Sequence, residues 1–482
     1  MMPNTGGAMP HNALTTTAVL ALRALCYNAH RRFHQSLQAP QKAQDRLLHK
    51  IVHDLSRTTY GHEHHIYGIE GYDAFAERLP VQDYDSFRPW IEQQLSGETA
   101  ITPHRVVHVE PTSGSSGATK SIPYTRPLLR AFSGMFRIWA YDLLSHGLEP
   151  ETGRIFMSLS PAAGGGFTDD RDYLGFPLRQ LLSPFLVMPP AKDMRSIARA
   201  LMKERDLEVI SVWSPSYLLE VMAQSPGANW RKLWPQLKLI SCWDSAQAAP
   251  LADKVRAVFP DVMVQGKGLL ATEGPLTIPL AQGCAPLVDS IFFEFEMPDG
   301  KIKRLHDLEP GERGEIIMTQ RGGLTRYRLG DIVEAGNRIG DTPTLSFLGR
   351  SAACDLAGEK LNAVFVREAL LTLLPDEDFI LLPQERGYVL VTEQAPENLA
   401  EKADIALCSA YHYGVARRLG QLLPLQVMEV SDLYLKLRAF HQACGMKPGD
   451  IKDSALMTDY QLARLLLNAL DRMQPLPVRT AA

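Results

Sequence analysis

The residues best suited to chemistry lie in one short segment, Thr112 to Pro123, which has the sequence TSGSSGATKSIP. Glycines let a backbone curl so that several N–H groups point at one anion, and the Ser and Thr hydroxyls add further donors. Lys120 adds a mobile positive charge. A flexible linker can have the same Gly and Ser content, but apolar runs adjoin this segment on both sides. The segment therefore predicts a loop that binds phosphate groups such as those of ATP.

This loop is close to a Walker A motif without matching it. The motif has a Gly, four residues, and then Gly-Lys-Ser/Thr at the start of a helix. Counted from Gly114, Lys120 and Ser121 fall in register, but Thr119 stands where the second Gly belongs. Pro123 follows closely and favours an extended segment over a helix. A P-loop phosphotransferase is therefore disfavoured.

Two later segments place an acidic residue beside a glycine. In GLLATEG, residues 268–274, Glu273 could hold Mg²⁺ and Thr272 could reach a phosphate or the metal. In YRLGDIVE, residues 327–334, we expect Asp331 in a turn between β segments, where it could accept both ribose hydroxyls of a nucleotide. Each also has an ordinary explanation, a solvated turn Glu in the first and a turn-capping Asp in the second.

Other basic and metal-binding residue types are less specific. Basic residues occur late in the chain in LGR (348–350), GEKL (358–361) and GDIK (449–452), and one of them could reach an α-phosphate from a mobile domain. An isolated Lys is more often a solvated surface residue. The run His62-Glu63-His64-His65 suggests a metal site, but Ile66 occupies the position of the second zincin His. We therefore expect these to be solvated loop histidines.

The hydrophobic pattern divides the chain into three regions. Residues 1 to about 100 are expected to be mainly helical. The next region is expected to be α/β, with buried strands at 155–159, 209–212, 237–241 and 262–264, helices at 194–203 and 252–258, and a small β-rich part at 286–297 and 314–334. After Leu348-Gly349-Arg350, helices at 363–374 and 399–419 and strands at 389–392 and 425–430 predict a separate α+β domain.

Composition limits the class of protein. A chain of 482 residues is expected to form two or more domains. A net charge of −4, with scattered Lys and Arg, does not suggest binding to nucleic acid or to a membrane surface. The six cysteines lie far apart, which predicts free, mostly buried thiols in a reducing compartment. The apolar stretch Ala18 to Cys26 is far shorter than the ~20 residues of a membrane span, so we expect a soluble, cytoplasmic protein.

The order and spacing of these motifs resemble one known family. The chain resembles the acyl acid-amido synthetases of the plant auxin-responsive Gretchen Hagen type, and most closely their bacterial relatives, in the adenylate-forming superfamily. The likeness spans nearly the whole chain and includes DDRDYLGFPLRQLLSPFLVMPP (169–190), ISVWSP (210–215), LISCW (239–243), GKGLLATEGPLTIPL (266–280) and FFEF (292–295). It implies an α/β fold with a large N-terminal adenylate-forming domain of mixed sheets, helices and a small β-rich subdomain (1–348), and a smaller, mobile α+β C-terminal domain (349–482).

The resemblance also assigns residues to roles. It implies a phosphate loop that contains Ser113, Gly114, Ser115, Ser116, Gly117 and Lys120. Thr272 and Glu273 fall on the pair that meets the α-phosphate and Mg²⁺, Asp331 on the ribose-binding Asp, and Arg350 in the hinge between the domains. The late catalytic Lys has two candidates. Lys447 precedes Pro448, whereas Lys452 matches the GDIK of bacterial relatives, and we favour Lys452.

The activity implied by the resemblance has two steps. A carboxylate first attacks the α-phosphorus of ATP to give acyl-AMP and pyrophosphate, and an amine, expected to be an amino acid, then attacks the acyl carbon to form an amide. Two alternatives stay open: transfer of the acyl group to the thiol of CoA or a carrier, and a non-catalytic nucleotide- or acyl-binding protein with the same fold. Trp213 and Trp243 could line the pocket of an aromatic acid or could serve only as packing.

Overall fold

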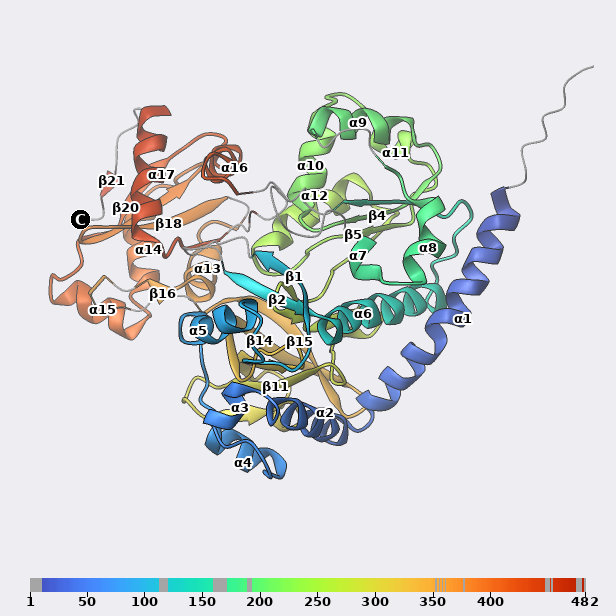
Figure 1. Ribbon diagram of the computed structural model, residues 1–482. Helices are drawn as coiled ribbons and strands as arrows, with labels where there is room; N and C mark the ends of the chain where they lie inside the picture. Colours follow the sequence, from blue (N-terminus) through green and yellow to red (C-terminus); the bar gives the residue numbers. More distant parts are fainter. Residues whose placement is uncertain are drawn as a thin grey trace, which may run out of the picture.

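The structure is a computed structural model that describes residues 11–111, 120–158, 171–188, 193–351, 353–354, 356–357, 359, 361–375, 378–446, 451, 454–473 and 479–480. A large α/β part is followed by a smaller α+β part, and Figure 1 shows the latter as a lobe at one side, from β18 to α17. Within these described residues, no helix combines the length and the apolar character needed to cross a bilayer.

The first hundred residues are mainly helical, as predicted. The helices are α1 (His11–Leu37), α2 (Pro40–Leu55), α3 (Thr59–Glu63), α4 (Gly71–Arg78) and α5 (Tyr84–Leu95). α2 begins at Pro40, whose fixed φ suits a first helical turn, and it buries Leu47, Leu48, Ile51 and Leu55 on one face. α1 runs along the outside of the molecule beside α6 (Arg126–Ser145) and α8 (Leu178–Leu182) (Figure 1).

The predicted buried strands form one parallel sheet. Its order is β3 (Arg154–Ser158), β4 (Leu207–Val212), β5 (Leu239–Ser241) and β6 (Met263–Gln265). In β4, Ile210 packs with α9 (Met194–Lys203), α10 (Pro215–Ala223) and α12 (Ala249–Val258), whereas Val209 packs against Leu143 of α6. The sheet is thus covered on both faces. Strand β6 lies at the sheet edge, and Met263 is 46% exposed there, so the prediction of a fully buried strand was wrong for β6.

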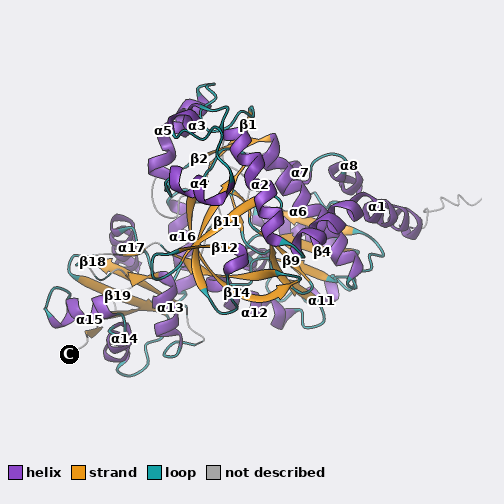
Figure 2. Ribbon diagram, turned by 90° about the horizontal axis from the view of Figure 1, so that it is seen from below, coloured by secondary structure: helices purple, strands orange, loops and turns teal. Residues whose placement is uncertain are grey.

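The β-rich segments form a five-stranded antiparallel sheet. Its order is β12 (Ile302–Arg304), β11 (Ile291–Glu296), β13 (Arg313–Gln320), β14 (Tyr327–Ile339) and β15 (Thr342–Arg350), and it packs with α2, α5 and α6 in the main hydrophobic core (Figure 2). Arg326, with a φ of 44°, precedes β14 and donates to the buried Glu294 of β11 at 2.7 Å. This buried ion pair fixes the point at which β14 begins.

Three short antiparallel hairpins complete the large part. They are β1 (Val106–Pro111) with β2 (Ser121–Thr125), β7 (Leu270–Ala271) with β8 (Gly274–Pro275), and β9 (Thr277–Leu280) with β10 (Gly283–Pro286). The extended conformation predicted for Tyr124-Thr125 is confirmed by β2.

The C-terminal part has its own sheet and cores. The sheet order is β18 (Phe379–Gln384), β19 (Gly387–Thr392), β20 (Gln426–Glu429) and β21 (Arg479–Thr480), with helices α13 (Ala363–Leu371), α14 (Leu399–Leu407), α15 (Tyr411–Arg418), α16 (Leu433–Ala443) and α17 (Tyr460–Met473). Two hydrophobic clusters of this part contain only residues from Cys354 onward. The domain boundary at 348/349 stays a prediction. Leu348-Gly349-Arg350 forms the end of β15.

The single helix predicted over residues 399–419 is instead two helices, α14 and α15. The buried carboxylate of Asp404 accepts a hydrogen bond from Tyr413 Oη at 2.7 Å and is paired with Arg417 at 2.6 Å. These contacts hold α15 against α14, so the chain breaks its helix between them. Hydrophobic spacing alone does not reveal such a contact.

Candidate active site

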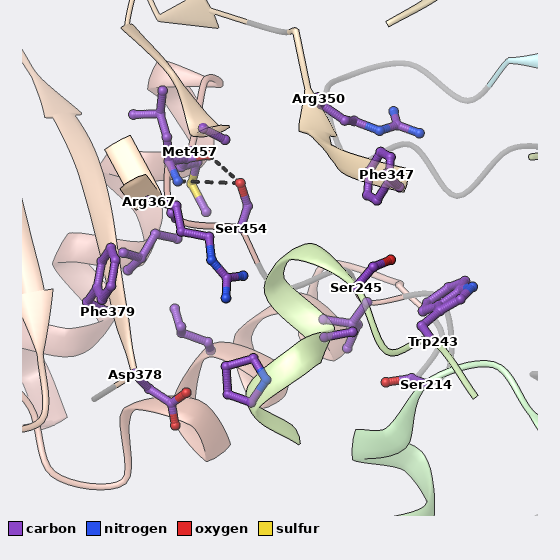
Figure 3. A pocket seen from close by; sticks show the side chains of 18 of the residues that line it. Ser214, Trp243, Ser245, Phe347, Arg350, Arg367, Asp378, Phe379, Ser454 and Met457 are labelled. Carbon is purple, nitrogen blue, oxygen red and sulfur yellow. Dashed lines mark hydrogen bonds between the residues drawn. The ribbon is translucent and has the colours of Figure 1, made fainter. Parts of the chain in front are cut away.

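A cleft of about 260 Å³ lies between the two parts of the molecule. The large part contributes Asp331, Phe347 and Arg350 from β14 and β15, together with Trp243 and Ser245. The C-terminal part contributes side chains from α13, β18, α16 and the segment before α17. Figure 3 shows Arg350 and Trp243 on one side of this cleft, and Arg367, Asp378 and Phe379 on the other. Burial lowers the pKa of Arg367, which comes from α13.

Lys120 and Glu273 are brought together by Tyr327, the first residue of β14. Lys120 Nζ donates to Tyr327 Oη at 3.3 Å, and Tyr327 Oη donates to Glu273 Oε1, also at 3.3 Å. The ammonium group also lies 5.4 Å from the ring centroid of Tyr84. Burial and the neighbouring Glu273 carboxylate raise the pKa of Tyr327 well above its usual range, so the phenol stays protonated. These contacts hold a cation and a carboxylate beside one another.

Thr272 and Glu273 form the two-residue turn between β7 and β8. The Thr272 carbonyl accepts a hydrogen bond from Tyr124 Oη at 2.7 Å, and Gln320 Nε2 donates to the Glu273 carbonyl at 3.5 Å. Glu273 is buried, with 7% of its surface exposed, so it is held within the fold and is not the solvated turn Glu of the ordinary explanation.

Asp331 and Arg350 face one another across β14 and β15. Arg350 Nε lies 3.3 Å from Asp331 Oδ1, and Asp331 is only 2% exposed. The prediction that Asp331 lies in a turn was wrong, because β14 continues through it to Ile339. Gly330 has a φ of 84°, and the β14–β15 register shifts just beyond, between Ile332 and Val333. The Gly-Asp pair therefore marks an irregularity inside a long strand.

Several predicted site residues lie outside the described residues. These are Ser113, Gly114, Ser115, Ser116 and Gly117 of the phosphate loop, and both late lysines, Lys447 and Lys452. Their flanking residues are described. Pro111 and Ser121 pair across β1 and β2, so the loop connects two strands of a hairpin. Ile451 and Ser454, on either side of Lys452, both line the cleft.

Three tyrosines with structural roles at the site were missed by sequence reasoning. Tyr327 links Lys120 to Glu273, Tyr84 Oη accepts a hydrogen bond from the Ser121 amide at 2.8 Å, and Tyr124 holds the turn at Thr272. A signal existed for Tyr327, because it opens the YRLGDIVE segment and alternation along a strand places it on the same side as Asp331.

Two smaller cavities lie in the large part next to the cleft. A narrow one of about 30 Å³ shares Leu270 with the cleft and contains Trp213, Ser211 and Lys267. Lys267 Nζ donates to Ser211 Oγ at 2.7 Å and lies 5.5 Å from the ring centroid of Trp213. The second cavity, of about 100 Å³, shares Phe136, Trp139, Met157 and Ser211 with the first. The three spaces therefore lie in series.

The two tryptophans noted in the sequence both line these spaces. Trp243 lines the cleft and Trp213 lines the narrow cavity, with ring centroids 5.8 Å apart. They are also joined through the backbone, since the Trp243 amide donates to the Trp213 carbonyl at 2.8 Å. Their position next to the cleft goes beyond ordinary core packing.

The remaining candidate groups lie away from the cleft. Within the histidine run, His62 and His65 are exposed, and His62 Nε2 lies 3.0 Å from the Ser56 carbonyl oxygen. All six cysteines are free thiols; three are buried, and burial raises the pKa of Cys26 to about 11 and that of Cys242 to about 12. Buried thiols with such pKa values are inert.

Comparison with known proteins identifies the family. A model of the GH3 family N-terminal domain matches residues 29–224, and a model of the GH3 family central domain matches residues 284–350. The two matches together cover more than half of the chain. This chain belongs to the GH3 family. The resemblance inferred from its motifs is confirmed.

The sequence relatives of this GH3 chain are distant. An indole-3-acetic acid-amido synthetase of Arabidopsis thaliana is 25% identical over 246 residues, which cover 41% of this chain and 41% of that protein. A human GH3 domain-containing protein is 25% identical over 167 residues, 32% of each chain. The chain thus matches less than half the length of these relatives.

The solved structures match over the full length of the fold. The acyl acid amido synthetase AtGH3.15 in complex with 2,4-DB has a TM-score of 0.77 at 16% identity, covering 100% of this chain and 99% of that one. A 2-hydroxyisobutyryl-CoA ligase with 2-HIB-AMP has a TM-score of 0.55 at 15% identity, covering 98% and 97%. The predicted fold, that of an adenylate-forming ligase, is therefore confirmed.

Proposed function

We propose that this GH3-family protein uses ATP to convert a carboxylic acid to acyl-AMP and then transfers the acyl group to an amine, an amino acid, to form an amide. The observation that carries the proposal is the buried Asp331–Arg350 pair on the wall of the cleft, with β7 leading from Leu270 of that wall to the turn at Thr272-Glu273, in a chain that belongs to this family. The amido synthetase relative and the adenylate-forming fold support it.

Asp331 is suited to bind the ribose of ATP. Its carboxylate lines the cleft and is almost fully buried, yet Oδ1 has no hydrogen-bond partner among the described residues, only the ion pair with Arg350. A buried acceptor without a hydrogen bond costs stability unless a ligand satisfies it. A pair of ribose hydroxyls would do so. The phosphates would bind to the predicted loop Ser113–Gly117 and to Lys120.

Glu273 is suited to hold Mg²⁺. Mg²⁺ sites in nucleotide enzymes commonly use one or two carboxylates together with the substrate phosphates. Glu273 is buried, and one of its oxygens, Oε1, is held by Tyr327 at 3.3 Å. When bound, the metal would neutralise charge on the phosphates of ATP.

The first step joins two anions, so positive charge has to be present where they meet. A carboxylate oxygen of the acid forms a bond to the α-phosphorus, and the bond from that phosphorus to the pyrophosphate oxygen breaks. Arg350 lines the large-part side of the cleft and Arg367 the opposite side, and Lys120 is held by Tyr327 of the strand that carries Asp331. Fixed cations in a cleft stabilise the charge that develops in the transition state. Lys452 is the further cation that we predict from the sequence.

The second step uses the same cleft. The nitrogen of the amine attacks the acyl carbon, the bond from that carbon to the AMP oxygen breaks, and the nitrogen loses a proton. The acceptor has to enter between the two parts of the molecule. We propose that residues 349–482 move as a domain about the segment at Arg350, which admits the amine after pyrophosphate leaves.

The cavities in series support a binding position for the acid. Its carboxylate would lie at the Leu270 end, where Lys267 supplies a positive charge, and its tail would extend past Trp139 into the deeper cavity. The two cavities measure about 30 and 100 Å³. Their combined volume is close to the ~150 Å³ of an apolar cavity that holds benzene. We propose an acid with an apolar tail, of about six to eight carbons in all.

ATP–pyrophosphate exchange tests the first step. The panel contains acetate, butyrate, hexanoate, octanoate, 3-phenylpropanoate and indole-3-acetate, each assayed with Mg²⁺. We expect exchange to be fastest with hexanoate, octanoate or 3-phenylpropanoate. No exchange with any acid would favour the non-catalytic binding protein.

The acceptor is tested next with the acid that gives the fastest exchange. Amino acids, simple amines and CoA are offered separately, and the acylated product is identified by mass spectrometry. An acyl-amino acid would support the proposal. An acyl-CoA as the sole product would replace the second step by thioester formation.

A further inference from the structure

A group of potential metal ligands lies away from the cleft, between α1 and α6. His30 and His34 are four residues apart on α1, so their side chains project from the same face of that helix. Asp142 lies opposite, on α6. One ligand atom from each of the three lies within 4.8 Å of the others, and the described part of the chain contains no second group of this kind.

The two imidazoles direct nitrogen atoms into this space. His30 Nε2 and His34 Nε2 are both buried, and neither has a hydrogen-bond partner among the described residues. The ring centroids are 4.2 Å apart. Buried polar atoms are nearly always satisfied by a partner, so two adjacent nitrogens without one are available to a ligand.

The carboxylate of Asp142 is oriented toward the same space. Its Oδ2 accepts a hydrogen bond from the Ala281 amide at 3.0 Å, while Oδ1 lies 3.9 Å from His30 Nε2 and 3.1 Å from His146 Nδ1. Asp142 is 2% exposed. Metal-binding carboxylates are typically held in this way by further hydrogen bonds behind them.

The ligand types and the spacing select the kind of ion. Imidazole nitrogen with carboxylate oxygen suits Zn²⁺ and similar transition metals, whereas Mg²⁺ and Ca²⁺ prefer oxygen alone. Bonds of ~2.0–2.1 Å to a tetrahedral ion place neighbouring ligand atoms about 3.4 Å apart. His30 Nε2 and Asp142 Oδ1 are 3.9 Å apart, and all three ligand atoms lie within 4.8 Å of one another, so binding requires shifts of about 0.5 to 1.5 Å.

We propose that His30, His34 and Asp142 bind one divalent transition-metal ion of the Zn²⁺ class, which fastens α1 to α6. The consequence for the molecule is mechanical. Leu22 of α1 and Leu143 of α6 both line the deeper apolar cavity, so an ion at this site would hold α1 in place over that cavity. The proposal does not depend on the proposed function, because the site is distinct from the cleft.

Zinc binding to the full chain tests the proposal. The protein is stripped with a chelator and titrated with Zn²⁺ alone, without nucleotide, by calorimetry and by metal analysis after desalting. We expect one ion per chain with a Kd below about 1 μM, and His34→Ala should weaken binding by at least about 100-fold. Co²⁺ in place of Zn²⁺ should give the visible absorption of a tetrahedral site, and this absorption should be absent in the variant.

Three controls make the result decisive. His65→Ala removes an exposed histidine and should bind Zn²⁺ as the wild type does. Glu273→Gln removes the predicted magnesium ligand and should also bind Zn²⁺ normally. The circular dichroism and Tm of metal-free His34→Ala should match those of the metal-free wild type; if His34→Ala does not fold, His30→Gln serves instead. Wild-type protein that binds no Zn²⁺ at 10-fold above the expected Kd, or equal loss of binding in His65→Ala, would overturn the proposal.

Discussion

The cleft and the two cavities lie in series, and the two ends of this series differ in character. At the cleft end, Asp331, Arg350 and Arg367 line the wall, and the strand that carries Asp331 begins with Tyr327, which contacts Lys120 and Glu273. At the far end, apolar side chains from α1, α6 and α8 predominate, and the carboxylate of Glu208 is occupied by the amides of residues 151–153. In the proposed function, the charged end carries out the reaction on ATP, and the apolar end selects the acid.

The largest effect is expected at the charged end, from Glu273→Gln. The variant keeps the shape of the side chain but loses the negative charge that would hold the metal. We expect the rate of ATP–pyrophosphate exchange to fall about 1,000-fold, and by the same factor for every acid in the panel. Steady-state ATP–pyrophosphate exchange with hexanoate and with butyrate measures the loss in rate for each acid.

Tyr327→Phe is the matched control for Glu273→Gln. It removes the hydroxyl that contacts Glu273 Oε1 but leaves the carboxylate in place. A reduction of about 10-fold is expected, since the hydrogen bonds to Glu273 and from Lys120 are lost while both charged groups remain. Exchange in Glu273→Gln at or above the rate of Tyr327→Phe would contradict the metal-binding role.

The next largest effect concerns a buried contact between the two parts of the molecule. Arg438 of α16 is 1% exposed, pairs with Glu220 of α10, and donates to Ser216 Oγ at 2.7 Å. Arg438→Met would leave Glu220 without its partner, which we expect to lower the free energy of unfolding by about 3 kcal/mol. Denaturant unfolding of the variant and the wild type measures this difference in the free energy of unfolding.

The pH dependence of Arg438→Met provides a second check. Burial already raises the pKa of Glu220, and Arg438 opposes that shift. Without Arg438 the pKa rises further, so the carboxyl group takes up a proton more readily and the deficit should shrink as the pH is lowered. Lys436→Met, on the same helix, should be near neutral. A deficit that grows on acidification would refute the ion-pair explanation.

A smaller and selective effect is expected at the apolar end. Ala140 of α6 lines the deeper cavity, and Ala140→Phe would fill much of its volume. We expect kcat/KM for octanoate to fall about 30-fold while that for butyrate changes less than about 2-fold, because only the longer tail needs the cavity. Leu20→Phe, at an exposed position of α1, should change neither value. Equal losses for both acids would show that the cavity does not hold the tail.

The smallest effect concerns His441, on the C-terminal wall of the cleft. Burial and Arg438 lower its pKa below the usual 6.5, so the folded protein takes up this proton less readily than the unfolded chain. Stability should therefore fall as the pH drops below 6.5 toward the lowered pKa. His441→Gln should flatten that slope by less than about 1 kcal/mol per pH unit.

Unfolding at pH 7.5, 6.5 and 5.5 measures the slope, with the exposed His49→Gln as the control. An unchanged slope in His441→Gln would assign the pH dependence to other groups. Such a result would not affect the roles proposed for the two ends of the cavities.

Much of the fold could be predicted from the sequence, because local patterns determine it. The strands of the parallel sheet are short apolar runs, and α9 was predicted with its observed bounds. Errors arose where a distant contact decides the local structure. Asp404 separates α14 from α15 through Tyr413, and the backbone at Gly330 carries β14 past Asp331.

The site was predicted in part. The motifs pointed to Glu273 and Asp331; the structure places Asp331 on the cleft wall and Glu273 in contact with Tyr327, and the roles of both stay predictions. Tyr327 was missed because its role depends on Lys120 and Glu273, which lie far from it in the sequence. The cavities could not be predicted either, since their walls combine α1, α6, α8 and the parallel sheet. The roles of Ser113–Gly117 and Lys452 stay predictions.

Transfer of an oxygen atom from the acid to AMP reports directly on whether acyl-AMP is formed. If the acid is activated as acyl-AMP, one carboxylate oxygen becomes bonded to the α-phosphorus and leaves with AMP when the amine reacts. Octanoate labelled with ¹⁸O in its carboxylate, incubated with the protein, ATP, Mg²⁺ and an amino acid, should therefore yield AMP that carries one ¹⁸O atom by mass spectrometry. Formation of ADP, or of AMP without label while the acyl product accumulates, would contradict the account.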